Sequence, residues 1–240
     1  MNTHSLAAVI MAAGQGKRMK NPDTAKVMHT LGGIPLIEHV YRLARDIGCE
    51  RTIVVVGHQR QSVIDYLSEV DPGIQFAVQE KQLGTGHAVQ MAEPPLENFT
   101  GDVVILSGDA PLTRRDTMLN ALETHRSTGA TVTVLTAVLP DPGGYGRVIR
   151  DENGNIIKIV EHKDANPEEL TVREINSGIY IFRATELFDA LRRIDNDNAQ
   201  GEYYLPDVFE IFSREGRTMV PQIVEDFNEI RGVNTIEQLA

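Results

Sequence analysis

The sequence has little cysteine and no long apolar run. Cys49 is the one cysteine in 240 residues, which excludes an internal disulfide framework and a multi-cysteine metal site within one chain. One cysteine fits a reducing cytoplasm, and we expect Cys49 to pack as a small apolar residue. The apolar run at residues 6–13 is too short to span a membrane, and no basic segment precedes it. We therefore expect neither a signal peptide nor a transmembrane helix, and no membrane partner.

Basic residues are also scarce. The chain has 23 Lys and Arg against 34 Asp and Glu, a formal net charge of −11, so a nucleic-acid backbone is not an expected partner. Residues 17–26 reverse this balance, with one acid, Asp23, among the four cations Lys17, Arg18, Lys20 and Lys26. A local excess of positive charge in an acidic chain favours a small anionic substrate over a polymer.

Strand-like and helix-like stretches alternate through the first half. Apolar β-branched runs predict strands, and apolar stripes at helical spacing predict helices. The strands are expected at 6–13, 51–57, 74–78, 102–106 and 131–138, and the helices at 35–47, 59–70, 84–91 and 113–127. This alternation predicts an α/β protein, Rossmann-like, with a mainly parallel central sheet.

The second half is less regular. An Asn-Gly turn at 153–154 predicts a hairpin between strands 146–150 and 156–161. Further strands are expected at 175–182 and 218–224, helices at 184–193 and 205–213, and a short terminal helix from Thr235. No linker, repeat or low-complexity segment interrupts the chain. We expect one domain over 1–240, with a nucleotide lobe to about residue 112 and a second-substrate lobe after it.

A glycine-rich turn with basic residues follows the first strand. Glycines such as Gly14 let backbone N–H groups approach an anion, and Arg18 and Lys26 add positive charge. Neither the dinucleotide fingerprint nor the P-loop matches, because Met19 replaces the third glycine of the former. The segment is either a phosphate-binding loop or a surface turn with solvated charges.

Two other polar segments follow predicted strands, and all three should gather at one edge of the sheet. Asp109, after strand 102–106, either holds Mg²⁺ together with substrate phosphates or caps the next turn. The amides of Gln79 and Gln82 suit the edge of a pyrimidine, or else belong to a polar loop that enters a helix. We expect His87 to be a structural hydrogen-bonding residue rather than a base.

Three polar residues of the second half have open roles. Glu161 and Asn176 either bind sugar hydroxyls or make hydrogen bonds within the protein. The amide oxygen of Asn234 is either a second metal ligand or part of a cap. The sequence has no serine or cysteine nucleophile motif and no zinc spacing.

Taken together, the motifs resemble the sugar-nucleotide pyrophosphorylases, and among them most closely the uridylyltransferase domain that makes UDP-N-acetylglucosamine. The matching segments run in the family's order along essentially the whole chain. They are AAGQGKRM, AKVMHTLGG, QEKQLGTGHA, SGDAPL, GGYGRVIR, VEHKDA, EINSGIYIF, NAQGEYYLPD and GVN.

The resemblance implies the reaction of UTP with N-acetylglucosamine 1-phosphate, giving UDP-N-acetylglucosamine and pyrophosphate, with Mg²⁺ as cofactor. It also implies roles for individual residues. Nucleotide binding falls to Ala12, Ala13, Gly14, Gln79, Gly84, Thr85 and Gly108; phosphate binding and catalysis to Arg18 and Lys26; Mg²⁺ to Asp109 and Asn234; and the sugar to Gly146, Glu161, Asn176 and Tyr203.

The chain departs from the family pattern at four positions. Lys17 replaces a Thr, Ala25 a Pro, Ser107 a Tyr and Met11 a Leu. These changes bear on substrate detail more than on reaction type, so a pyrophosphorylase for a different sugar or nucleotide stays an alternative, as does a non-catalytic sugar-nucleotide-binding protein. The hexapeptide repeats of the family's acetyltransferase domain do not occur in the sequence, so we expect no acetyltransferase activity.

Overall fold

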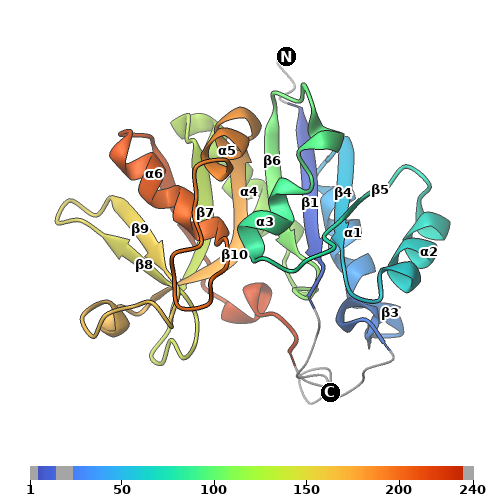
Figure 1. Ribbon diagram of the computed structural model, residues 1–240, viewed down its shortest axis with the longest axis horizontal. Coiled ribbons are helices and arrows are strands. Elements are labelled where there is room, and N and C mark those ends of the chain that lie inside the picture. The colour runs from blue at the N-terminus through green and yellow to red at the C-terminus, as the bar shows by residue number, and fades with distance from the viewer. Residues whose placement is uncertain (1–4, 15–23, 235–240) are drawn as a thin grey trace.

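The structure is a computed structural model that describes residues 5–14 and 24–234 (Figure 1). In this part of the chain, nine strands form one mixed sheet in the order β11-β7-β10-β6-β1-β4-β5, and the hairpin β8-β9 pairs with β10. The strands are β1 (Leu6–Ala12), β4 (Arg51–Val56), β5 (Gln75–Val78), β6 (Asp102–Ser107), β7 (Val132–Val138), β8 (Arg147–Arg150), β9 (Ile156–Val160), β10 (Glu174–Arg183) and β11 (Met219–Ile223).

The centre of the sheet is parallel. Strand β1 pairs in parallel with both β4 and β6, and β4 pairs in parallel with β5. Strand β10 runs antiparallel between β6 and β7, and so joins the two halves of the chain in one continuous sheet. The predicted α/β fold with a Rossmann-like mixed sheet is confirmed.

Helices cover both faces of the sheet (Figure 1). Alternate residues of β1 enter two separate cores: Ala8 and Ile10 pack in one, and Ala7 and Val9 in the other. Both faces of a central parallel strand are buried in this way, which explains its uninterrupted apolar sequence. The helices are α1 (Leu36–Asp46), α2 (Arg60–Val70), α3 (Thr85–Gln90), α4 (Arg115–Thr128), α5 (Ala184–Leu191) and α6 (Val208–Arg214).

Helix α1 shows how local sequence sets an element. Leu36, Val40 and Leu43 form its buried stripe. Gly48, beyond its end, has a φ of +92°, a conformation that glycine adopts without strain. Pro35 lies just before the first helical residue and not inside the first turn, so the predicted start was one residue early.

The predicted elements agree with the structure to within a few residues, apart from the shortest ones. The hairpin β2 (Thr30–Leu31) and β3 (Ile34–Pro35) and the 3₁₀ turn η6 (Phe227–Ile230) were not predicted, because two to four residues are too few to show a periodicity. Another 3₁₀ turn, η5 (Leu205–Asp207), precedes α6, where a single helix was expected. The predicted helix from Thr235 lies outside the described residues.

Candidate functional site

A cavity of about 310 Å³ opens beyond the carboxyl ends of β1 and β6. Strand β4 pairs with one side of β1, and β6 pairs with the other side. The carboxyl end of β1 is therefore a topological switch point of the parallel sheet. Ligands bind at such points in open α/β folds. The cavity is lined by Met11, Ala12, Ala13, Gly14, Lys26, Val27, Gln79, Gln82, Gly84, Thr85, Ala88, Ser107, Asp109 and Glu202.

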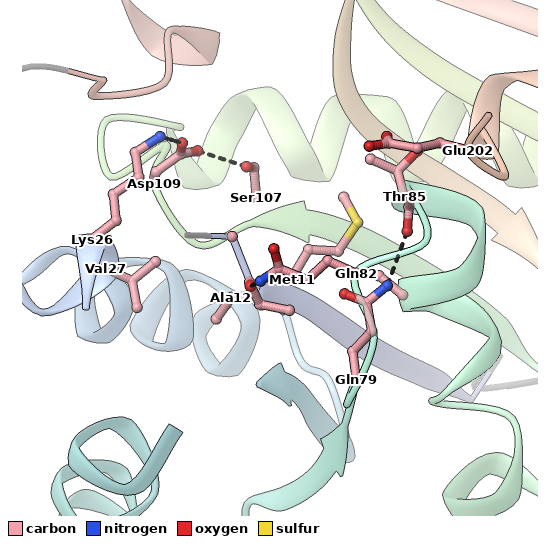
Figure 2. Close-up of a pocket in the computed structure, with 14 residues that line it drawn as sticks. Met11, Ala12, Lys26, Val27, Gln79, Gln82, Thr85, Ser107, Asp109 and Glu202 are labelled. Atoms are coloured by element: carbon pink, nitrogen blue, oxygen red, sulfur yellow. Dashed lines mark hydrogen bonds and ion pairs between the residues drawn. The ribbon is translucent and has the colours of Figure 1, made fainter. Parts of the chain in front are cut away.

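The cavity has two chemically different ends. Figure 2 shows Lys26 and Asp109 at one end and Gln79, Thr85 and Glu202 at the other, with Met11 and Ala12 between them. The charged end offers the ammonium group of Lys26 and the carboxylate of Asp109. The other, which we call the neutral end, offers the Gln79 amide and the Thr85 hydroxyl, with Glu202 beside Thr85. This division suits an elongated ligand with an anionic part and a polar cyclic part.

The charged end is organised around one ammonium group. Lys26 Nζ contacts a carboxylate oxygen of Asp109 and lies 2.8 Å from Oδ1 of Asn234. Ser107 Oγ donates to the other oxygen of Asp109 at 2.6 Å. The side chain of Asp109 thus faces Lys26 and Ser107 and accepts from no backbone N–H of the next turn within the described residues, which disfavours a purely capping role.

The neutral end begins directly after β5. Gln79 is 4% exposed, and its Nε2 donates to the carbonyl oxygen of Gly84 at 3.1 Å. Gly84 has a φ of +110°, and a Cβ built on it would overlap the carbonyl oxygen of Tyr203 and lie 2.8 Å from the Tyr203 nitrogen. Only a glycine fits here, because both the backbone conformation and the space exclude a side chain.

Residues from the second half of the chain hold this loop in place. Tyr203 donates its N–H to the carbonyl of Leu83 at 2.7 Å and accepts from the N–H of Gly86 at 2.7 Å. Leu205 N donates to Thr85 Oγ1 at 2.9 Å. The expected boundary near residue 112 is therefore not a boundary of the cavity, since residues after 200 shape its neutral end.

Two further contacts complete the first cavity. Gln82 Nε2 donates to the carbonyl oxygen of Ala13 and so fixes the chain where it leaves β1. Glu202, which was not predicted as a site residue, lines the cavity beside Thr85. It lies in the same GEYYLPD segment as Tyr203, and that position was the one available signal in the sequence.

A second polar cluster lies where β10 meets the hairpin β8-β9. Asn176 N donates to the carbonyl of Gly146 at 3.0 Å. The space beside Gly146 faces Asn176 and Glu161: a Cβ placed there would lie 3.6 Å from Asn176 Cβ and 3.7 Å from Glu161 Oε1. The structure therefore brings together three of the four predicted sugar-binding residues.

The side-chain amide of Asn176 makes its hydrogen bonds to residues of its own strand. Its Nδ2 donates to Tyr180 Oη at 2.7 Å, and its Oδ1 accepts from Gly178 N at 3.1 Å. Strand β10 shifts its register against β7 between Asn176 and Tyr180, and this irregularity makes room for the two bonds. The buried amide thus has partners without a ligand, and one amide hydrogen is left for another acceptor.

Glu161 differs from its neighbours. Burial raises the pKa of its carboxyl group above the usual range, and the nearby carboxylates of Asp164 and Glu202 raise it further. No ion pair or hydrogen bond to its carboxylate occurs among residues 5–14 and 24–234. Glu202 also lines the first cavity, so its carboxylate acts on the second cluster from there.

Two predicted residues lie elsewhere. Arg18 is outside the described residues. Gly108 is buried and does not line the cavity; its N–H donates to the Met11 carbonyl at 3.0 Å, and a Cβ would lie 3.0 Å from Ile37 Cδ1. Its close contacts are thus with the protein's own β1 and α1.

Two other kinds of site are absent from the described ranges. No group of three or more His, Cys, Asp or Glu side chains there could hold a metal ion. No helix there has both the length and the apolarity needed to cross a membrane.

Comparisons with known proteins identify the family of this chain. The family model described as "Nucleotidyl transferase" matches residues 7–228. The chain is 48% identical to the bifunctional protein GlmU of Exiguobacterium sibiricum over 97% of its own length and 51% of that protein's. It is 49% identical to the bifunctional protein GlmU of Geobacter metallireducens over 98% of its length and 49% of that protein's. The chain thus spans about half the length of the curated relatives it matches.

The same fold occurs in a solved structure. A UDP-glucose pyrophosphorylase complexed with UDP-glucose superposes with a TM-score of 0.77, covering 95% of this chain and 94% of that one, at 17% identity. The length of the family match and the identity to these relatives establish the family: the chain belongs to the nucleotidyl transferases.

Proposed function

We propose that this chain is a uridylyltransferase that makes UDP-N-acetylglucosamine and pyrophosphate from UTP and N-acetylglucosamine 1-phosphate. One observation carries the proposal: Lys26, Asp109 and Asn234 converge at one end of a cavity whose other end presents the Gln79 amide. A nucleoside triphosphate has the same division, with phosphates at one end and a base at the other. The chain matches about half the length of two relatives, and both are named bifunctional protein GlmU. Their shared name supports the same assignment.

The nucleotide follows the long direction of this cavity. Ala12, Ala13 and Gly14 lie against the uridine, and Gln79 and Gly84 recognise the uracil edge, with Thr85 beside them. Lys26 binds the phosphates at the charged end, together with Arg18. Gly108 belongs to the nucleotide site through packing, because it lets the end of β6 lie close to β1.

The sugar phosphate occupies the cluster at β8 and β10. The backbone at Gly146 leaves room beside Glu161 and Asn176, and a carboxylate with an amide is a common pair for sugar hydroxyls. Tyr203 contributes through its backbone, because it holds the loop at Gly84 on which the nucleotide rests.

The donors at the charged end fit Mg²⁺. Asp109 and Asn234 both direct oxygens at one cation, the Lys26 ammonium, and Mg²⁺ prefers a few protein oxygens together with substrate phosphates. When bound there, Mg²⁺ would neutralise phosphate charge. Lys26, released from this pair, would be free to bind a phosphate oxygen.

The reaction needs alignment more than proton transfer. The attacking phosphate oxygen of the sugar phosphate is already anionic at neutral pH, so no general base is required. It forms a bond to the α-phosphorus, and the bond from that phosphorus to the departing pyrophosphate breaks. The obstacle is repulsion between two anions, which Lys26, Arg18 and the backbone N–H groups near Gly14 lower by charge and position.

A substrate panel monitored by pyrophosphate release tests the proposal. UTP, CTP, TTP and GTP are each paired with N-acetylglucosamine 1-phosphate, glucose 1-phosphate and mannose 1-phosphate. We expect the highest kcat/KM for UTP with N-acetylglucosamine 1-phosphate. A different best pair would identify another pyrophosphorylase, and UDP-sugar binding without pyrophosphate from any pair would identify a binding protein.

Cellular location is part of the same proposal. We assign the chain to the cytoplasm, supported by its one cysteine. Burial raises the pKa of the Cys49 thiol to about 12, so the group stays protonated as a packing residue. Detection of the protein in fractionated cells would test this assignment.

A further inference from the structure

The side-chain amide of Gln79 is held by two acceptors. Its Nε2 lies 3.1 Å from the carbonyl oxygen of Gly84 and 2.9 Å from Nδ1 of His87. A carbonyl oxygen can only accept a hydrogen bond, so the end of the amide that faces Gly84 must be the NH₂ group. The second amide hydrogen then points to His87, and both hydrogens of Gln79 are used.

This arrangement leaves one end of the amide for a ligand. Figure 2 shows the Gln79 oxygen pointing into the cavity on the side of Ala12. In the described part of the chain, no hydrogen bond reaches this oxygen, and none uses the N–H of Gly84. The neutral end of the cavity therefore combines a fixed acceptor, Gln79 Oε1, with the adjoining backbone of Gly84.

His87 itself does not line the cavity. It lies on α3, one helical turn after Gly84, and contacts the Nε2 end of the Gln79 amide. To accept from Nε2, its Nδ1 must carry a lone pair, so the neutral ring must hold its proton on Nε2. Burial lowers the pKa of the His87 imidazole, which keeps the ring neutral at physiological pH.

We propose that His87 is a positioning residue that fixes the orientation of the Gln79 amide and thereby selects uracil over cytosine. Uracil carries an N–H at ring position 3, which pairs with a fixed acceptor. Cytosine carries a lone pair at that position, so it cannot donate a hydrogen bond to the Gln79 oxygen. If the amide turned over, its NH₂ group would favour cytosine instead. This inference rests on the proposed function, since it concerns the base-binding end of that site.

The main test measures kcat/KM for UTP and for CTP with the same sugar phosphate. His87→Phe keeps a ring but removes the acceptor, and we expect the UTP to CTP ratio to fall about tenfold, the value of one neutral hydrogen bond. The KM for the sugar phosphate should stay within twofold. His87→Asn, whose amide oxygen can replace Nδ1, should keep most of the discrimination. An unchanged ratio in His87→Phe, or equal losses in both variants, would overturn the proposal.

A double variant separates an action through Gln79 from an independent one. If His87 acts only by orienting that amide, adding His87→Phe to Gln79→Ala should leave the ratio of Gln79→Ala unchanged. A further loss in the double variant would show that His87 acts in another way, and the inference would be wrong.

A third measurement does not depend on catalysis. Nitrogen-15 NMR of the ligand-free protein reports which ring nitrogen of each histidine carries the proton, and the signal absent in His87→Asn assigns His87. We expect the Nε2–H tautomer; a proton on Nδ1 would overturn the inference. If the wild-type chain released no pyrophosphate with any substrate pair, the proposed function would fail, whereas the tautomer would still test the orientation of Gln79.

Discussion

The two polar clusters of this protein treat charge in opposite ways. At the end of β6, the carboxylate of Asp109 has a cation, Lys26, and a hydroxyl donor, Ser107. At the hairpin β8-β9, the carboxylate of Glu161 has neither among the described residues, and its pKa is raised by burial. The carboxylate of Asp109 already binds one cation and can bind another in its place. The buried carboxylate of Glu161 would be stabilised by hydrogen bonds from ligand hydroxyls.

The clusters also differ in how the chain builds them. The first is centred on Asp109, which follows the parallel strand β6, and the carboxyl ends of parallel strands meet at one sheet edge for any sequence with this topology. The second depends on a hairpin and on an irregular antiparallel strand, where Asn176 and Tyr180 bond within one strand. The first cluster is thus a product of topology, and the second of local irregularity.

Removing Asp109 should have the largest effect. We expect Asp109→Ala to lower turnover by about 10³ or more and to abolish its dependence on Mg²⁺, because the charged end loses the carboxylate that faces Lys26. Ser107→Ala, which removes only the hydrogen bond to that carboxylate, is the matched control and should lose less than tenfold. Initial rates across a Mg²⁺ titration measure both. Unchanged metal dependence in Asp109→Ala would remove the residue from the metal site.

The backbone at Gly84 packs too closely against Tyr203 to accept a side chain, whereas the backbone at Gly14 does not. A pair of alanine variants tests this difference. Gly84→Ala meets the Tyr203 backbone at a positive φ and should destabilise the fold by about 2 kcal/mol, roughly 5 °C in melting temperature. A Cβ at Gly14 has no neighbour within 4 Å in the described structure, so Gly14→Ala should melt like the wild type and lose only nucleotide affinity. Equal melting temperatures for the two variants would contradict this view of Gly84.

Changes in the second cluster should alter the KM for the sugar phosphate and leave the KM for UTP nearly unchanged. We expect Glu161→Gln to raise the KM for N-acetylglucosamine 1-phosphate about tenfold, because a charge-assisted hydrogen bond becomes a neutral one, with the KM for UTP within twofold. Asp164→Asn changes a neighbouring carboxylate that accepts from Ala199 N, and it should leave both KM values nearly unchanged. An equal rise for UTP in Glu161→Gln would place this residue at the nucleotide instead.

The smallest expected effect concerns stability rather than catalysis. Burial and the carboxylates of Asp195 and Glu161 raise the pKa of Asp207 from 3.8 to about 7. The folded state therefore binds the proton more tightly than the unfolded state, and Asp207 costs stability as pH rises from about 4 to about 7.

Asp207→Asn removes this cost, so the variant should be more stable than the wild type at pH 8, by about 1–2 kcal/mol after solvent screening, and nearly equal at pH 4. Denaturant unfolding at the two pH values measures the difference. Asp116→Asn, on the exposed surface of α4, is the control and should change neither value. A gain at pH 4 equal to that at pH 8 would exclude titration of Asp207 as the cause.

The sequence by itself determined the fold class, most elements and the edge of the sheet where the site lies. Hydrophobic period shows which segments are strands and helices, and alternation of the two fixes where strand ends meet. Hence Gly14, Gln79 and Asp109 could be assigned to one edge of the sheet before their positions were known. The residues alone left the roles of Asn234, Glu161 and Asn176 open, and the motif resemblance assigned them.

Tertiary structure alone decided which groups bond to one another. Nothing in the sequence pairs Lys26 with Asp109 and Asn234, directs the Gln79 amide toward His87, or places Glu202 in the first cavity. Contacts across 80 or more residues, and the orientation of an amide, depend on how distant segments pack, and hydrophobic patterning carries no information about them.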